Sequence, residues 1–223
     1  VRDELTVTIM PRVNIDGFDA NPRGSPWREN VDPNVCPAPT PCPAFYTRGR
    51  GYDINRYHSY LVSDPRDDPN TGPVGTGQGD NPVPEALAAR AAYDAAGGPQ
   101  VVEVVMDLHH QGTPLDANGD MVTGSTLWPN ATSTADALGI RPQFDGVIFR
   151  SKQVVATLVE AVHQYGYANL SRYPGTTPPG ISRNAYGLLG SASVLVEPLD
   201  LAALGEDWAF PPASAEAAPH PRA

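Results

Sequence analysis

The hydrophobic pattern of the chain predicts three strands and two helices. Short apolar runs that favour β-structure lie at residues 5–10, 101–106 and 191–196, and polar or turn-forming residues bound each run. We expect the two later runs to be buried. Residues 84–96 predict a helix, because a proline stands near its start and two glycines follow its end. Residues 145–165 predict a second helix, since their apolar residues recur at helical spacing.

Two long segments rich in Pro, Gly and polar residues separate these elements, over residues 19–52 and 63–82. Loops longer than about 15 residues in a compact domain are usually functional or disordered. The order strand, loops, helix, strand, loop, helix, strand predicts a three-layer α/β domain. We assign this domain to residues 1–208 and expect a disordered tail over residues 209–223, where Pro and Ala dominate.

Composition narrows the classes of function. The chain has 25 acidic and 15 basic residues and a formal net charge of −10. This balance argues against a nucleic-acid partner, because nucleic-acid-binding proteins need a basic face. The sequence contains no run of 18 apolar residues, so it predicts no membrane span.

The two cysteines, Cys36 and Cys42, enclose a proline-rich stretch. Their pairing would close a short loop and would suit an oxidising compartment, and we favour a disulfide over two free thiols. A secreted or periplasmic location is the matching expectation, although residues 1–4 lack the pattern of a signal peptide.

Two predicted strands end on side chains that can carry chemistry. His109 follows Asp107 at the end of one strand, and Glu197 ends another. In an open α/β sheet, ligands gather at the carboxyl ends of the strands. A histidine there can bind a metal, and a carboxylate can act as general base on a water molecule. The structural alternatives are a hydrogen-bonded Asp–His pair and a solvated glutamate.

Arginines add a candidate for anion recognition. Arg56 follows Asn55, and an Asn–Arg pair can hold a carboxylate through a bidentate guanidinium and an amide donor. The alternative is a surface ion pair between Arg56 and Asp53, which would contribute little to stability. Arg28 follows Trp27 in a predicted loop.

Five stretches, in this order, resemble motifs of the zinc carboxypeptidases, the M14 metallopeptidases. The resemblance extends over residues 5–200, and the ordered set is far more specific than any single stretch. The stretches are Pro11-Arg12-Val13-Asn14-Ile15-Asp16-Gly17-Phe18, Trp27-Arg28, Gly51-Tyr52-Asp53-Ile54-Asn55-Arg56, Asp107-Leu108-His109 and Ser193-Val194-Leu195-Val196-Glu197.

The resemblance implies a three-layer α/β/α fold with a mixed central sheet. It also implies a zinc enzyme that removes the C-terminal residue of a peptide with a free carboxylate. Each matching residue takes a role by that resemblance: His109 as a zinc ligand, Glu197 as the catalytic base, Arg28 at the oxyanion, and Asn55 with Arg56 at the terminal carboxylate of the substrate.

Two further positions match the family's substrate pocket. Tyr173 lies about two dozen residues before the catalytic glutamate, where the family carries a mobile tyrosine, with Tyr167 and Tyr186 as rivals. Tyr186 more closely resembles the tyrosine of the pocket wall. Arg183 falls where the family sets side-chain preference, so it could favour acidic C-terminal residues. Its alternative role is to brace the loop by pairing with an acid such as Asp200.

The chain departs from the family in its zinc ligands. The family's other two ligands are a His and a Glu in a His-x-x-Glu motif, upstream of the Asn-x-Asp-Gly turn. No histidine here is followed by Glu at that spacing. We expect a truncated family member rather than a metal-free relative. Two alternative functions stay open: an N-acyl amino acid deacylase of the aspartoacylase type, and a non-catalytic peptide-binding relative.

We predict that the 223-residue chain binds zinc weakly. A catalytic zinc site normally takes three protein ligands, and His109 is the one ligand that the resemblance identifies. Calorimetric titration of the chain with zinc, beside a His109→Ala control, measures this. Stoichiometric sub-micromolar binding would contradict the prediction, and His110 would then be the first further ligand to test.

Overall fold

The fold is taken from a computed structural model that describes residues 6–11, 13–14, 30, 51–109, 118–119, 122–164, 169–173, 175 and 177–198. Helices and strands are interspersed along the described chain. The elements are η2 (Ile54–Arg56), α2 (Pro84–Ala95), η3 (Gly98–Gln100), β1 (Val104–Leu108), β2 (Gly124–Leu127), α3 (Thr132–Ala137), α4 (Arg141–His163), β3 (Leu170–Arg172), α5 (Ser182–Leu189) and β4 (Ala192–Pro198).

The strands form one mixed sheet in the order β1-β4-β2-β3. β1 pairs with β4 in parallel and β2 pairs with β3 in parallel, whereas β2 and β4 are antiparallel. The α/β prediction with a mixed sheet is therefore confirmed. The β1–β4 register sets Leu108 opposite Val196, so the residues that follow these two positions lie side by side.

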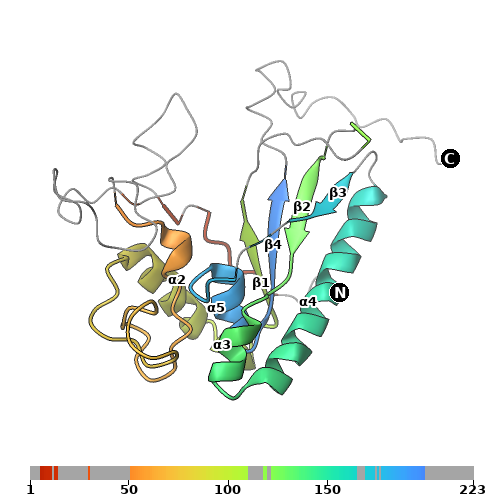
Figure 1. Ribbon diagram of the computed structural model, residues 1–223. Helices are drawn as coiled ribbons and strands as arrows, with labels where there is room; N and C mark the ends of the chain where they lie inside the picture. Colours follow the sequence, from red (N-terminus) through yellow and green to blue (C-terminus); the bar gives the residue numbers. More distant parts are fainter. Residues whose placement is uncertain are drawn as a thin grey trace.

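β4 is an inner strand covered by helices. Its residues Ala192 to Leu195 are buried, and Val194 is fully inaccessible to solvent. Both α4 and α5 contact it (Figure 1). The alternation of β1 shows that these helices meet different faces of the sheet. Met106 lines a groove with α4, whereas Asp107 turns to α5 and hydrogen-bonds to Ser182.

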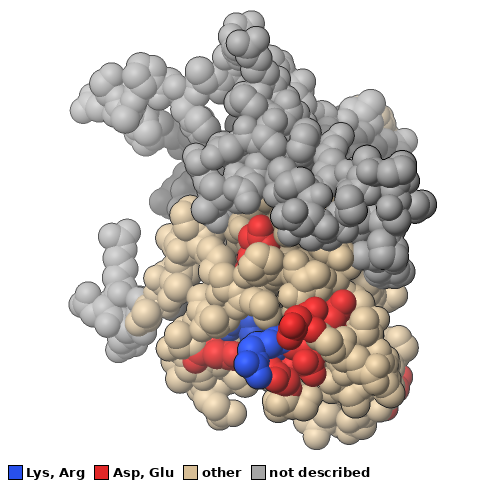
Figure 2. All heavy atoms as spheres, turned by 90° about the vertical axis from the view of Figure 1, so that its left-hand side faces the viewer, with Lys and Arg blue, Asp and Glu red and all other residues tan. Residues whose placement is uncertain are grey.

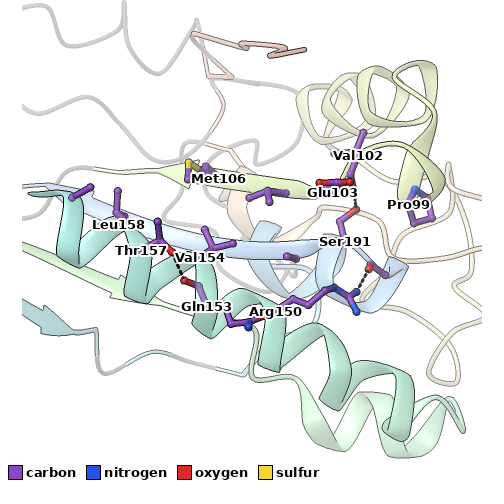
Figure 3. A pocket seen from close by; sticks show the side chains of 14 residues that line it. Pro99, Val102, Glu103, Met106, Arg150, Gln153, Val154, Thr157, Leu158 and Ser191 are labelled. Atoms are coloured by element: carbon purple, nitrogen blue, oxygen red, sulfur yellow. Dashed lines mark hydrogen bonds between the residues drawn. The ribbon is translucent and has the colours of Figure 1, made fainter. Parts of the chain in front are cut away.

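The groove between β1 and α4 is apolar and open. Its volume is about 820 Å³. Figure 3 shows Met106 of β1 on one side of it, with Val154 and Leu158 of α4 on the other. Because β1 is an edge strand of the described sheet, Met106 is 49% exposed and Leu108 70%. The prediction that this run is buried was therefore wrong for β1.

Two clusters of buried side chains pack residues 54–61 against the helices. In the smaller cluster, Ile54 and Tyr57 pack against the start of α2, so the short helix η2 is held in place. The larger cluster joins the next residues to α3, α4 and α5 through Tyr60, Leu61, Ala131, Ala135, Phe144, Ala185 and Leu188.

Four predicted elements are present with shifted ends. The helix expected over 84–96 is α2, and the one expected over 145–165 is α4, which begins earlier with a proline in its first turn. The strand expected over 191–196 is β4, which extends far enough to include Glu197. The strand expected over 101–106 is β1 and starts three residues later, because η3 precedes it.

The strand expected over residues 5–10 was wrong for its described part. Residues 6–10 have no regular structure, and Val7 and Ile9 are 64% and 76% exposed. A β-prone segment forms a strand only when another strand supplies the ladder partner. The prediction for the loop at 63–82 was confirmed, since these residues form turns and one isolated bridge.

Several sequence predictions lie outside the described residues. They concern most of the motif at 11–18, the Trp27–Arg28 pair, Cys36 and Cys42, and the tail over 209–223. Within the described ranges, no helix is both long and apolar enough to cross a membrane.

The charged side chains of one face are mixed in sign. Figure 2 shows a small basic group bordered by acidic side chains on this face. Among the residues of the loop at 63–82, the guanidinium of Arg66 donates two hydrogen bonds to Asp64, and the charges of Asp67 and Asp80 also act on it. Such exposed pairs contribute little to stability.

We predict opposite effects for two Gly→Ala substitutions. A Cβ at Gly180 would overlap the carbonyl oxygen of Arg56, whereas a Cβ at Gly146, inside α4, would meet nothing closer than Arg150 at 3.8 Å. Gly180→Ala should lower the free energy of unfolding by about 1–3 kcal/mol through overpacking. Gly146→Ala should raise it by about 0.5–1 kcal/mol, because Ala favours helix.

Denaturant unfolding of both variants measures these changes. A Gly180→Ala variant as stable as the parent would show that residues 56 and 180 do not approach as closely as described.

Candidate functional site

The candidate site forms where β1 and β4 end side by side. The backbone N–H of His109 donates to the carbonyl of Val196 at 2.9 Å, which continues the β1–β4 ladder one residue beyond β1. The next residue of β4 is Glu197, which is 6% exposed. Strand pairing therefore brings together two predicted site residues that lie far apart in the sequence.

The imidazole of His109 lies between two carboxylates. Its Nε2 is 3.0 Å from Oδ1 of Asp107, and its Nδ1 is 3.6 Å from Oε1 of Glu197. An ionised carboxylate can only accept a hydrogen bond, so we assign a proton to Nε2, which places an N–H against Asp107. This assignment turns Nδ1 toward Glu197, where its lone pair is available when the ring is neutral.

The two carboxylates control the protonation of the site. Burial by itself would lower the pKa of His109, but the nearby carboxylates of Asp107 and Glu197 raise that pKa to about 9. Burial would raise the pKa of Asp107, but the interaction with His109 and a hydrogen bond from Ser182 hold it at about 2. Without metal, His109 is therefore a cation at neutral pH, and a metal at Nδ1 would have to displace a proton.

Asn55 reaches the same cluster from η2. Its Nδ2 donates to Oδ2 of Asp107 at 3.1 Å and lies 3.0 Å from Nε2 of His109. Its Oδ1 accepts from the backbone N–H of Ser182 at 2.7 Å. The side chain of Asp53 accepts from the N–H of Asn55 at 3.1 Å and so caps η2.

Arg56 lies beside this cluster. Its Nη1 donates to the carbonyl of Asn55 at 2.7 Å and is 3.8 Å from Oδ2 of Asp53. The Asp53–Arg56 ion pair considered from the sequence is thus present. It is largely buried, with side chains 9% and 12% exposed, rather than a surface pair.

Arg183 and Tyr173 approach the cluster from other elements. Arg183 of α5 is 2% exposed, and its Nη2 lies 3.4 Å from Oδ1 of Asn130. Burial is the main cause that lowers the pKa of Arg183 to about 10, and the charges of Asp107, Tyr173 and Glu197 oppose this shift. Tyr173 is half-buried directly after β3. Asp200, the alternative partner of Arg183, lies outside the described residues.

Sequence reasoning missed a buried histidine at the site. His58 is 6% exposed and lies 3.4 Å, through Nδ1, from the hydroxyl of Tyr186. Burial is the main cause that lowers the pKa of His58; Asp107 opposes this shift and His109 adds to it, and the resulting pKa is about 4. His58 is therefore neutral where His109 is charged. Its position two residues after Arg56 was the available signal.

Among the described residues, His109 is the one side chain with the features of a zinc ligand. A carboxylate behind the distal ring nitrogen is the usual support of a zinc-bound histidine, and Asp107 provides it for His109. Within the described part of the chain, no group of three or more His, Cys, Asp or Glu side chains could hold a metal ion. Arg28 and His110 lie outside that part.

The structure thus brings four predicted site residues together: His109, Glu197, Asn55 and Arg56. Arg183 follows Ser182 in α5, and Tyr173 and Glu197 act on its charge. In comparisons with known proteins, no family model, no curated protein and no solved structure matches the chain. The family resemblance accordingly depends on the quoted residues and on their arrangement.

We predict that His109 and His58 titrate on opposite sides of pH 6.5 in the metal-free chain. Folding favours protonated His109, so its contribution to stability is complete below pH 6.5 and is lost as the pH rises to about 9. Folding favours neutral His58, so stability is lost as the pH falls from 6.5 toward about 4.

Imidazole NMR signals across this pH range, with His58→Asn and His109→Asn variants for assignment, give both midpoints. A midpoint near 6.5 for His109 would contradict its placement between two carboxylates.

Proposed function

We propose that this protein is a zinc-dependent metallocarboxypeptidase that hydrolyses the C-terminal peptide bond of peptides. The proposed fold is a carboxypeptidase-like, three-layer α/β/α domain. The proposal is carried by one observation: Nδ1 of His109 faces Glu197 at 3.6 Å while Asp107 holds Nε2 from behind. A ligand and a general base placed together in this way suit the activation of a water molecule.

The convergence of separate motifs supports the same proposal. Asn55 contacts the His109–Asp107 pair across more than fifty residues of sequence, and Arg56 follows it directly. These residues come from two of the stretches that resemble the carboxypeptidase family.

Each residue takes a chemical role in this proposal. Glu197 removes a proton from the attacking water and passes it to the leaving amine. Asp107 keeps the ring of His109 in one tautomer. Arg28, by resemblance, stabilises the negative charge that develops on the carbonyl oxygen.

His109 would hold the zinc ion through Nδ1. When bound, zinc supplies the Lewis acidity that polarises the scissile carbonyl. A metal ion would compete with a proton for Nδ1, the nitrogen that faces Glu197.

Recognition of the substrate carboxylate is assigned to Arg56, with Asn55 and Tyr173 as the other candidates from the family pattern. A free terminal carboxylate pairs with a guanidinium, and an internal peptide bond offers no such charge. Arg183 is the candidate for side-chain preference, because a buried guanidinium favours an acidic side chain and disfavours an apolar one.

One observation favours a second candidate, a non-catalytic peptide-binding protein. The described residues provide a single recognised zinc ligand, whereas Arg56 and Arg183 need no metal to bind carboxylates. Hydrolysis that requires zinc separates the two functions. Turnover of N-acyl amino acids but not of peptides would instead indicate a deacylase.

We predict different kinetic effects for two substitutions in the protein as its gene encodes it, assayed with zinc. Glu197→Gln should lower kcat by at least about a hundredfold with little change in KM, because it removes proton transfer and keeps the shape. Arg56→Ala should mainly raise KM and weaken the discrimination against amidated peptides.

Steady-state kinetics with free and amidated peptides ending in Glu or Leu measure both effects. The role of Arg56 is contradicted if its alanine variant still prefers free carboxylates. A preference for Leu would leave Arg183 as a structural residue.

A further inference from the structure

Ser182 links three segments of the site, although nothing in its sequence context marks it. It is the first residue of α5 and is 4% exposed. Its hydroxyl donates to Oδ2 of Asp107, and its backbone N–H donates to Oδ1 of Asn55 at 2.7 Å. Asn55 in turn donates to the same Oδ2 of Asp107 at 3.1 Å. Ser182, Asn55 and Asp107 therefore form a closed ring of hydrogen bonds.

The hydroxyl of Ser182 is not used to cap its helix. Serine near the start of a helix commonly accepts a hydrogen bond from a free N–H of the first turn. Here the N-cap is Ile181, and α5 has no side-chain cap. The hydroxyl instead points at Asp107, so its role belongs to the carboxylate rather than to the helix.

The two carboxylate oxygens of Asp107 have different partners. Oδ2 accepts from Ser182 and Asn55, which fixes the carboxylate plane. Oδ1 is then directed at Nε2 of His109 at 3.0 Å. If the carboxylate turned, Oδ1 would leave Nε2 and the ring of His109 would lose its orientation toward Glu197.

We propose that Ser182 is a positioning residue that fixes Asp107 and, through it, the direction in which His109 presents Nδ1 to Glu197. Asn55 completes the ring of hydrogen bonds through its contacts with Asp107 and Ser182. The effect of Ser182 on His109 follows from the contacts alone, and its effect on turnover rests on the proposed carboxypeptidase function.

The test compares Ser182→Ala and Ser182→Thr with a control, Ser191→Ala. Ser191 is equally buried, at 2% exposure, and its hydroxyl donates to the carbonyl of Val102 at 2.6 Å, away from the site. Ser182→Thr keeps a hydroxyl that can donate to Asp107.

The first measurement is the NMR signal of the Nε2 proton of His109 in the metal-free chain. We expect a sharp, hydrogen-bonded signal in the parent, the Ser182→Thr variant and the Ser191→Ala variant. In Ser182→Ala we expect it to broaden or shift upfield, because Asp107 is no longer held. An unchanged signal in folded Ser182→Ala would overturn the proposal.

The second measurement is turnover of a peptide with a free C-terminus in the presence of zinc. Supporting residues behind a metal ligand typically contribute about 10–100-fold to affinity or activity. We expect Ser182→Ala to lower kcat about tenfold while KM changes little, and Ser182→Thr to restore kcat. Unchanged kcat in an active protein would overturn the proposal.

The two measurements separate this inference from the proposed function. A parent protein without peptidase activity would refute the proposed function, while the NMR comparison would still decide the role of Ser182. If Ser182→Ala does not fold, Asp107→Asn provides the second variant, because it keeps the shape and removes the charged acceptor. The Nε2 proton signal must then change, and its persistence would overturn the proposal.

Discussion

The contact between Asp107 and His109 is the interaction on which the site depends. It favours one tautomer of the imidazole, raises its pKa together with Glu197 to about 9, and turns Nδ1 toward Glu197. A buried carboxylate is stable only when its oxygens are satisfied, and Asp107 obtains its partners from η2, from α5 and from His109, directly after β1. Asp107 therefore both joins separate segments of the fold and orients His109.

The parallel pairing of β1 and β4 provides the second constraint. It sets His109 beside Glu197, and a slip of one residue would turn one of the two side chains to the other face of the sheet. Helix α5 then covers this face and carries Ser182 and Arg183 to the cluster. Segments distant in sequence thus meet at the carboxyl ends of neighbouring parallel strands, where α/β proteins commonly bind ligands.

Sequence patterns predicted the helices and strands in which apolar residues are buried and turn residues mark the ends. Helix α2 has its proline and glycine signals, and Glu197 and His109 follow apolar runs. β2 was missed because its residues, Gly-Ser-Thr-Leu, are small and polar yet buried. α5 buries polar residues together with apolar ones: Arg183 and Asn184 are 2% and 0% exposed, and both form hydrogen bonds with Asn130. The exposure of β1 depends on strand neighbours, which no local pattern encodes.

The location of a bound zinc ion tests the central claim most directly. Crystals of the protein as its gene encodes it, grown with zinc, can be measured at wavelengths on both sides of the zinc absorption edge. The account predicts an anomalous peak about 2.0–2.1 Å from Nδ1 of His109, on the side of Glu197, with Nε2 still bound to Asp107. A zinc ion held elsewhere, or His109 turned so that Nε2 faces Glu197, would contradict it.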